Sequence, residues 1–168
     1  MKLAVDVYYQ KNKATAAGVL FPKWTSVQPL KKFVSHINQV EEYIPGQFYK
    51  RELPCILKLI HKHKIAPNYI IIDGYVYLDG SNRPGLGKYL YERLNATIPV
   101  IGVAKNPFKN ISEKYEIYRR NSIKPLYVTA AGLPLDKAKK YILKMQGSYR
   151  IPDLLREVDQ LSKCNYNI

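Results

Sequence analysis

The first forty residues alternate apolar and polar positions as β-strands do. Residues 2–10 and 13–21 are predicted strands, and the Lys11–Asn12 pair between them predicts a tight turn. The alternation continues through residues 23–29 and 32–40, as further strands or an extended arm. The N-terminal quarter of the chain is therefore predicted to be a β-meander.

After Pro45-Gly46, helical patterns alternate with short apolar runs. Helices are predicted at residues 53–64, 84–94, 135–145 and 152–163, and strands at 68–72, 98–104 and 125–129. The runs YIIID and IPVIGVA are typical of inner strands that are covered on both faces. A meander followed by alternating helices and buried strands predicts an α/β fold, a three-layer α/β/α sandwich around a central mixed sheet.

Length and composition narrow the class of protein. The 168 residues contain no repeat or linker, so we expect a single domain over residues 1–168. No apolar run approaches the ~18 residues of a membrane span, and the N-terminus lacks an apolar signal segment, so we expect a cytoplasmic protein with no membrane partner. Two cysteines exclude a disulfide scaffold. The sequence has no G-x-G-x-x-G or P-loop motif, which argues against a nucleotide cofactor.

The charge of the chain is strongly positive and unevenly distributed. Lys and Arg number 27 against 13 Asp and Glu, a formal charge of +14. Residues 1–65 contribute +7 and residues 105–150 contribute +8, whereas residues 66–104 are neutral. Two basic regions around a neutral centre indicate a polyanionic partner, with nucleic acid the first candidate. An anionic membrane, an acidic protein or a simply solubilising surface are the alternatives.

Three carboxylates are candidates for a metal site. Asp6 lies inside the apolar strand LAVDVYY, where an ionised carboxylate is costly unless it is paired or binds a metal. Asp73 ends YIIID, at the edge where open α/β sheets place their ligands. If these strands are parallel neighbours, the two carboxylates converge, and Glu52 at the start of the predicted helix can point to the same place. Such oxygen donors suit Mg²⁺ or Mn²⁺ facing a phosphodiester.

Each candidate also has a plainer interpretation. Asp6 can pair with a basic side chain, Asp73–Gly74 can form only a turn, and Glu52 can be a helix acid favoured by the macrodipole. Lys105 ends the strand IGVAK at the same edge. It can neutralise a carboxylate or a developing phosphate charge, or it can be a solvated lysine. The residue pattern alone leaves these alternatives open.

The order and spacing of several motifs resemble the endonuclease V family, whose fold is ribonuclease H-like. The matching segments are VDV at 5–7, YIPG at 43–46, RE at 51–52, IIDG at 71–74, GL at 85–86, IPVIGVAK at 98–105, PLYVT at 125–129 and YRIPDLLREVDQLS at 149–162. No single motif is decisive, but together they cover most of the chain in the family's order.

This resemblance implies a Mg²⁺-dependent endonuclease, with Mn²⁺ as a substitute, that acts on DNA or RNA containing deoxyinosine or inosine. The family cuts the second phosphodiester bond 3′ to the deaminated adenine and leaves 3′-hydroxyl and 5′-phosphate ends. The resemblance implies that Asp6, Glu52 and Asp73 are catalytic metal ligands and that Lys105 is a catalytic lysine beside them. We expect a monomer with no obligate protein partner.

The resemblance also implies how the substrate is opened. Tyr43, Ile44 and Pro45 match the family's wedge, which separates the strands at the lesion, with Tyr43 stacking there. An extruded base must be held in a pocket. The small residues Gly74 and Gly102, beside the active edge, are candidates for lining it.

The chain departs from the family pattern in three places. Glu42 stands where the family usually has a wedge proline. Residues 79–81 are Asp-Gly-Ser where it has His-Pro-Arg, and residues 130–133 are Ala-Ala-Gly-Leu where it has Gly-His. Two active-site histidines are therefore missing. Asp79 is a candidate extra metal ligand or base, and Arg83 is a candidate phosphate contact.

These departures leave an alternative to the enzyme. The chain can be a catalytically impaired nucleic-acid-binding module of the same fold, or a related nuclease with a different substrate preference. The three carboxylates and Lys105 favour the enzyme, because a binding module has little reason to keep a costly acidic cluster.

Overall fold

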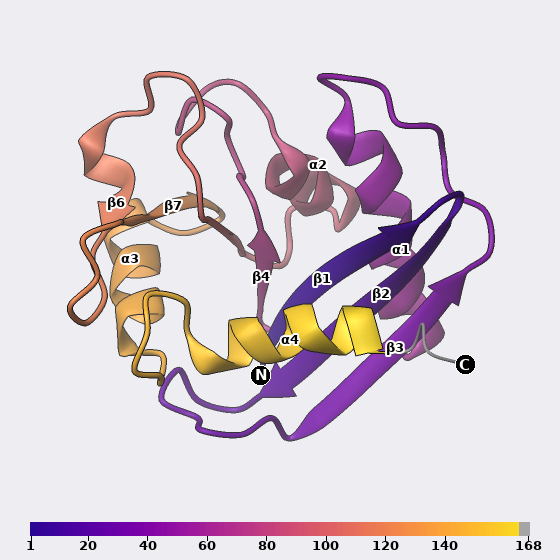
Figure 1. Cartoon of the computed structure of the whole chain (residues 1–168), viewed down its shortest axis with the longest axis horizontal. Coiled ribbons are helices and arrows are strands. Elements are labelled where there is room, and N and C mark those ends of the chain that lie inside the picture. The colour runs from indigo at the N-terminus through magenta and orange to yellow at the C-terminus, as the bar shows by residue number, and fades with distance from the viewer. Residues whose placement is uncertain (165–168) are drawn as a thin grey trace.

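The computed structural model describes residues 1–164, which form a seven-stranded sheet in the order β3-β2-β1-β4-β5-β7-β6 (Figure 1). The strands are β1 (Lys2–Gln10), β2 (Lys13–Phe21), β3 (Lys31–Ile37), β4 (Tyr69–Asp73), β5 (Val100–Ala104), β6 (Glu116–Ile117) and β7 (Leu126–Ala131). The helices are α1 (Phe48–Lys62), α2 (Leu86–Arg93), α3 (Leu135–Lys144) and α4 (Asp153–Lys163), with a short 3₁₀ helix η1 (Glu113–Tyr115).

The sheet is mixed, as the sequence predicts. Strands β1, β2 and β3 form the antiparallel meander, whereas β4 pairs in parallel with both β1 and β5. Strand β7 is antiparallel to β5 and to β6. In the β1–β4 pair, Val5 lies opposite Ile72, so the next residues, Asp6 and Asp73, are neighbours at the carboxyl ends of the two strands.

Helices cover both faces of the sheet. On one face Leu3, Val5 and Ile72 pack with residues of α1 and α2 in one core cluster. On the other face Ala4 and Ile71 pack with α3 and α4 in a second cluster. Figure 1 shows α4 crossing in front of β1 and β2, with α1 and α2 behind the sheet. The predicted three-layer α/β/α sandwich, with its ribonuclease H-like layering, is confirmed.

The main differences from the predicted elements lie around residues 22–62. Residues 22–30 form turns and not a strand, and β3 is confined to Lys31–Ile37. Helix α1 begins at Phe48, so Pro54 lies in its interior and Glu52 lies in its second turn. Proline in a helix interior loses a hydrogen bond, and burial of Leu53 and Ile56 offsets that loss. With this earlier start, Glu52 lies near Asp6 and Asp73, at the carboxyl ends of β1 and β4.

Across residues 1–164, no helix combines the length and apolarity needed to cross a lipid bilayer.

Candidate active site

Asp6 and Asp73 face the same layer of the sandwich. Side chains alternate between the faces of a strand, so Asp6 shares a face with Ala4, and Asp73 shares a face with Ile71. Ala4 and Ile71 belong to the core cluster beneath α4. The two carboxylates therefore lie side by side on the α4 face, where their strands end. The convergence expected if these strands were parallel neighbours is confirmed.

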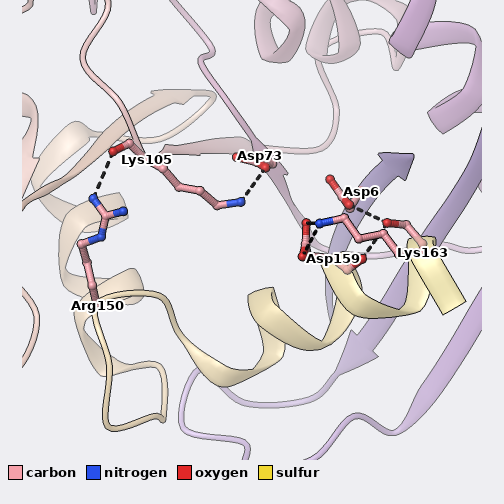
Figure 2. A network of polar contacts seen from close by, with 7 residues as sticks. Asp6, Asp73, Lys105, Arg150, Asp159 and Lys163 are labelled. Atoms are coloured by element: carbon pink, nitrogen blue, oxygen red, sulfur yellow. Dashed lines mark hydrogen bonds and ion pairs between the residues drawn. The ribbon is translucent and has the colours of Figure 1, made fainter. Parts of the chain in front are cut away.

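The last turn of α4 lies over Asp6. Leu154, Val158 and Ser162 follow one another at intervals of four residues along the buried stripe of α4, and Ser162 is fully buried. The Ser162 hydroxyl donates to Asp6 Oδ2 at 2.7 Å and lies 2.8 Å from the backbone oxygen of Asp159. Apolar packing of α4 thus places a hydrogen-bond donor on Asp6 (Figure 2).

Asp159 brings a fourth carboxylate to this place. Its negative charge contributes to raising the pKa of Asp6, and both residues line the same narrow cavity of about 30 Å³ together with Asp73 and Lys105. Lys163 Nζ lies 2.9 Å from each Asp159 carboxylate oxygen. Figure 2 shows this ion pair beside Asp6.

Lys105 follows β5 and reaches Asp73. Its Nζ donates to Asp73 Oδ2 at 3.1 Å. The backbone of the same lysine is held from the other side, since Arg150 Nη1 donates to Lys105 O at 3.0 Å and to Pro125 O at 3.1 Å. Of the roles that the sequence left open for Lys105, contact with a carboxylate is present in the structure (Figure 2).

Glu52 approaches from α1 and is only 5% exposed. In the described part of the chain, its carboxyl has no hydrogen bond and no ion pair. Burial raises the pKa of Glu52 well above its usual range, and the charges of Asp6 and Asp73 raise it further. Burial likewise raises the pKa of Asp6, against the opposing effect of the Ser162 hydrogen bond. Of the three carboxylates Asp6, Glu52 and Asp73, only Asp73 forms an ion pair, with Lys105.

This donor set fits a divalent cation chemically. The donors are carboxylate oxygens, which Mg²⁺ and Mn²⁺ prefer, and Glu52 is buried without a partner. As they stand, no three His, Cys, Asp or Glu side chains among residues 1–164 enclose one metal position. Lysines contact two of the four carboxylates instead, Lys105 on Asp73 and Lys163 on Asp159.

The predicted wedge residues precede α1 in an exposed loop. Tyr43 is 58% exposed and Ile44 is 48% exposed, and Pro45 is also at the surface. Large apolar side chains that are exposed in this way can contact a partner. A hollow of about 150 Å³ adjoins this loop, and its lining includes Gly46 and Gly74. Asp73 lines both this hollow and the carboxylate cavity.

The two glycines proposed for the base pocket have different positions. Gly74 lines the hollow and has a φ of +123°, a conformation that glycine adopts most readily. Gly102 does not line it. A Cβ at Gly102 would lie 2.5 Å from Gly74 O and 2.8 Å from Val76 N, so this glycine lets the chain after β4 pass directly over β5. Gly102 therefore affects the hollow only through the backbone at Gly74 that packs over it.

Asp79 and Arg83 lie in the loop between β4 and α2. Asp79 Oδ1 accepts hydrogen bonds from the backbone N–H groups of Ser81, Asn82 and Arg83, and these bonds lower the pKa of Asp79. This carboxylate closes its own loop and does not line the carboxylate cavity, so we do not carry it into the proposed metal site. Arg83 stacks over Phe108 at 5.6 Å and does not line that cavity either.

Sequence reasoning missed Asp159, Ser162 and Arg150. A signal was available for Ser162, because it is a polar residue on the apolar stripe of a predicted helix, and buried polar groups require partners. Asp159 lies three residues before it, in the segment YRIPDLLREVDQLS. Arg150 gave no signal, because its contacts are backbone oxygens of distant residues.

Replacement of Ser162 by alanine should destabilise the protein. The change leaves Asp6 Oδ2 buried without its donor, at a cost of about 1–3 kcal/mol in the free energy of unfolding. Urea denaturation at neutral pH measures this loss. Ser81→Ala, at an exposed loop position, is the matched control and should change stability by less than about 0.5 kcal/mol. Equal stabilities of the two variants would contradict the assigned hydrogen bond.

Comparison with known proteins identifies the family. The family model for endonuclease V matches residues 3–117. A protein named endonuclease V from Rippkaea orientalis is 31% identical over 180 residues, which cover 95% of this chain and 76% of that protein. The crystal structure of endonuclease V from Streptomyces avermitilis superimposes with a TM-score of 0.76 at 26% identity, over 96% of this chain and 79% of that one.

A third comparison supports the fold. The structure of endonuclease V from Ciona intestinalis has a TM-score of 0.78 at 18% identity, covering 97% of this chain and 84% of that one. The match to the family model spans more than half of the residues, and the similarity to the Rippkaea protein extends over nearly the whole chain. The chain belongs to the endonuclease V family and is a nuclease of the hydrolase class.

Proposed function

We propose that this protein is a metal-dependent endonuclease that cuts DNA or RNA at the second phosphodiester bond 3′ to a deoxyinosine or inosine. The observation that carries this proposal is the buried, unpartnered Glu52 carboxyl beside Asp6 and Asp73. The Ciona intestinalis relative was crystallised with a 24mer DNA containing an inosine followed by a ribo-adenosine, which supports an inosine substrate for this chain. The formal charge of +14 on this chain favours a nucleic-acid partner.

Asp6, Glu52 and Asp73 would hold the metal, with Asp159 as a further donor. Endonuclease V enzymes are in general metal-dependent, and Mg²⁺, with Mn²⁺ as a substitute, suits these donors. When bound, such a cation supplies Lewis acidity toward a phosphoryl oxygen and lowers the pKa of a water molecule. Hydrolysis adds water to phosphorus and breaks the P–O3′ bond, so the products carry 3′-hydroxyl and 5′-phosphate ends.

Lys105, Arg150 and Ser162 would neutralise charge at the site or hold its residues in position. Lys105 places its ammonium 3.1 Å from Asp73 Oδ2, where it can stabilise the negative charge that develops on the phosphoryl group. Arg150 holds the backbone of Lys105, and Ser162 holds Asp6. Through these two contacts, Arg150 and Ser162, which lie late in the chain, hold Lys105 after β5 and Asp6 on β1.

Tyr43, Ile44 and Pro45 would act as the wedge, and the hollow lined by Gly74 would receive the base. Asp73 lines the hollow, so a base held there would lie next to one of the carboxylates. Extrusion of a base costs a few kcal/mol of stacking and pairing, and it costs least at a weak pair such as one with inosine.

The test is cleavage of labelled oligonucleotides that contain one inosine or deoxyinosine, with adenosine-containing oligonucleotides as controls. Inosine-dependent cleavage that requires Mg²⁺ or Mn²⁺ and stops in EDTA is the expected result. Binding without cleavage would instead indicate a catalytically impaired module, and cleavage of adenosine controls at the same rate would indicate a different substrate preference.

Addition of Mg²⁺ or Mn²⁺ alone should raise the thermal stability of the metal-free protein. The cation relieves the repulsion among the carboxylates of the folded state, and at 100 times its Kd it stabilises that state by about 2.7 kcal/mol. Differential scanning fluorimetry measures the shift in Tm. Glu52→Gln with Asp73→Asn should abolish it. An unchanged wild-type Tm at millimolar Mn²⁺ would contradict the metal site.

A further inference from the structure

A second hollow, of about 520 Å³, adjoins the base pocket near the start of α1. Tyr49 lines both hollows. Of the predicted wedge, Ile44 lines this second hollow, and Gly46, just after the wedge, lines the first. The wedge itself therefore borders the second hollow, whereas the residue after it borders the first, which Asp73 also lines.

Charged side chains of both signs line this second hollow. Glu41 and Glu42 come from the loop before α1, Lys50 comes from α1 and Arg93 comes from the last turn of α2. All four are exposed. In the part of the chain that the structure describes, none of them forms an ion pair or a hydrogen bond. Four charges around one hollow thus remain available to an occupant.

The lining residue that the two hollows share is aromatic. Tyr49 stacks on Tyr89 of α2, with ring centroids 3.8 Å apart and an interplanar angle of 19°. This stack joins α1 to α2. An aromatic side chain in the lining is a surface against which a nucleobase can pack.

We propose that this second hollow holds the unpaired nucleotide that faces the inosine on the complementary strand. The inference rests on the proposed function. When the wedge sends the inosine base into the pocket beside Asp73, the opposing base loses its partner at the same position. The second hollow is lined by Ile44 of the wedge, and its volume is in the range of ligand pockets.

The charges suit a nucleotide and suit some bases better than others. Lys50 and Arg93 can contact the phosphate of the opposing nucleotide. Glu41 and Glu42 can accept hydrogen bonds from the exocyclic amino groups of cytosine, adenine or guanine. Thymine and uracil offer only one N–H donor between two carbonyl oxygens. Glu42, which replaces the family's usual wedge proline, therefore becomes a residue that selects the opposing base.

The test compares single strands with duplexes. Kd is measured by fluorescence anisotropy in EDTA, for one deoxyinosine oligonucleotide alone and paired with strands that place cytosine or thymine opposite the lesion. Arg93→Ala should weaken duplex binding about ten-fold, as expected for one lost charge-assisted contact, and change single-strand binding by less than about two-fold. Lys62→Ala removes one positive charge at an exposed position of α1 and is the control. It should change single-strand and duplex binding alike.

A second variant tests base selection. For each protein, the Kd of the duplex with thymine opposite the lesion is divided by the Kd of the duplex with cytosine there. Glu42→Gln should reduce this ratio by about five-fold relative to wild type. Pairing strength cancels, because the same two duplexes are compared in both proteins.

The outcomes separate this inference from the proposed function. Equal weakening of single-strand and duplex binding by Arg93→Ala, or no weakening of either, would overturn the opposing-strand site. An unchanged ratio in Glu42→Gln would overturn its role in base selection. The proposed function is tested by a different comparison, wild-type binding and cleavage of inosine against adenosine oligonucleotides, and its failure would be visible there whatever Arg93→Ala does.

Discussion

Asp73→Asn is expected to lose inosine-directed cleavage by at least about a thousand-fold, because removal of a metal-ligand charge costs several kcal/mol of transition-state stabilisation. Its affinity for the same oligonucleotide should change by less than about three-fold, because binding depends mainly on phosphate contacts by basic side chains. Asp73 is half-exposed at the end of β4, so the isosteric change should leave the fold intact. Single-turnover cleavage and anisotropy measure the two quantities.

Asp136→Asn is the matched control for this variant. Asp136 is an exposed carboxylate in the first turn of α3 and does not line the carboxylate cavity. Its replacement should leave the cleavage rate within about two-fold of wild type. An Asp73→Asn protein that cleaves within ten-fold of wild type would remove Asp73 from the metal site.

Glu52→Gln is expected to abolish cleavage and, in EDTA at pH 8, to stabilise the protein by about 1–3 kcal/mol. The stabilisation arises because Glu52 is buried beside Asp6 and Asp73 without a partner, so its negative charge is disfavoured in the folded state. The folded state raises the pKa of Glu52 above its ordinary value of 4.5. The folded protein therefore retains this proton over a pH range in which the unfolded chain has lost it, and stability falls as the pH rises above about 4.5.

The pH dependence distinguishes this cause from a packing effect. Near pH 4.5 Glu52 is protonated in the folded protein and resembles glutamine, so the stability difference between the variant and wild type should shrink toward zero. Urea denaturation at pH 5 and pH 8 measures it. Glu41→Gln, at an exposed residue, should change stability by less than about 0.5 kcal/mol at both pH values. A Glu52→Gln protein less stable than wild type at pH 8 would show that Glu52 is already satisfied.

Much of the fold was predictable because its signals are local. Strands β1 and β2 are confirmed at the predicted residues, since a period of two and a two-residue turn fix both strands. The start of α1 was predicted five residues too late, because proline is usually placed in the first turn of a helix. Packing of Leu53 against the core overrides that preference. The short strand β6 carries too few residues to show any period.

The site was predictable where chemistry and chain position coincide. Asp6 is an acid within an apolar strand, and Asp73 is an acid at a strand end, so both are conspicuous in sequence. Asp159 is an ordinary helix acid in sequence, and only the crossing of α4 over β1 brings it to Asp6. Gly102 was also conspicuous in sequence as a small residue in a strand, and the structure shows the close packing of backbone around Gly74 that it permits.

The most direct test of this account is the position of the cut and its dependence on Asp6. An end-labelled oligonucleotide with one inosine is incubated with Mg²⁺ and either wild-type protein or Asp6→Asn, and the products are sized against a ladder. We expect one wild-type product, ending one nucleotide beyond the inosine, and no product with Asp6→Asn. Wild-type binding without any cut, or a cut that persists in Asp6→Asn, would contradict it.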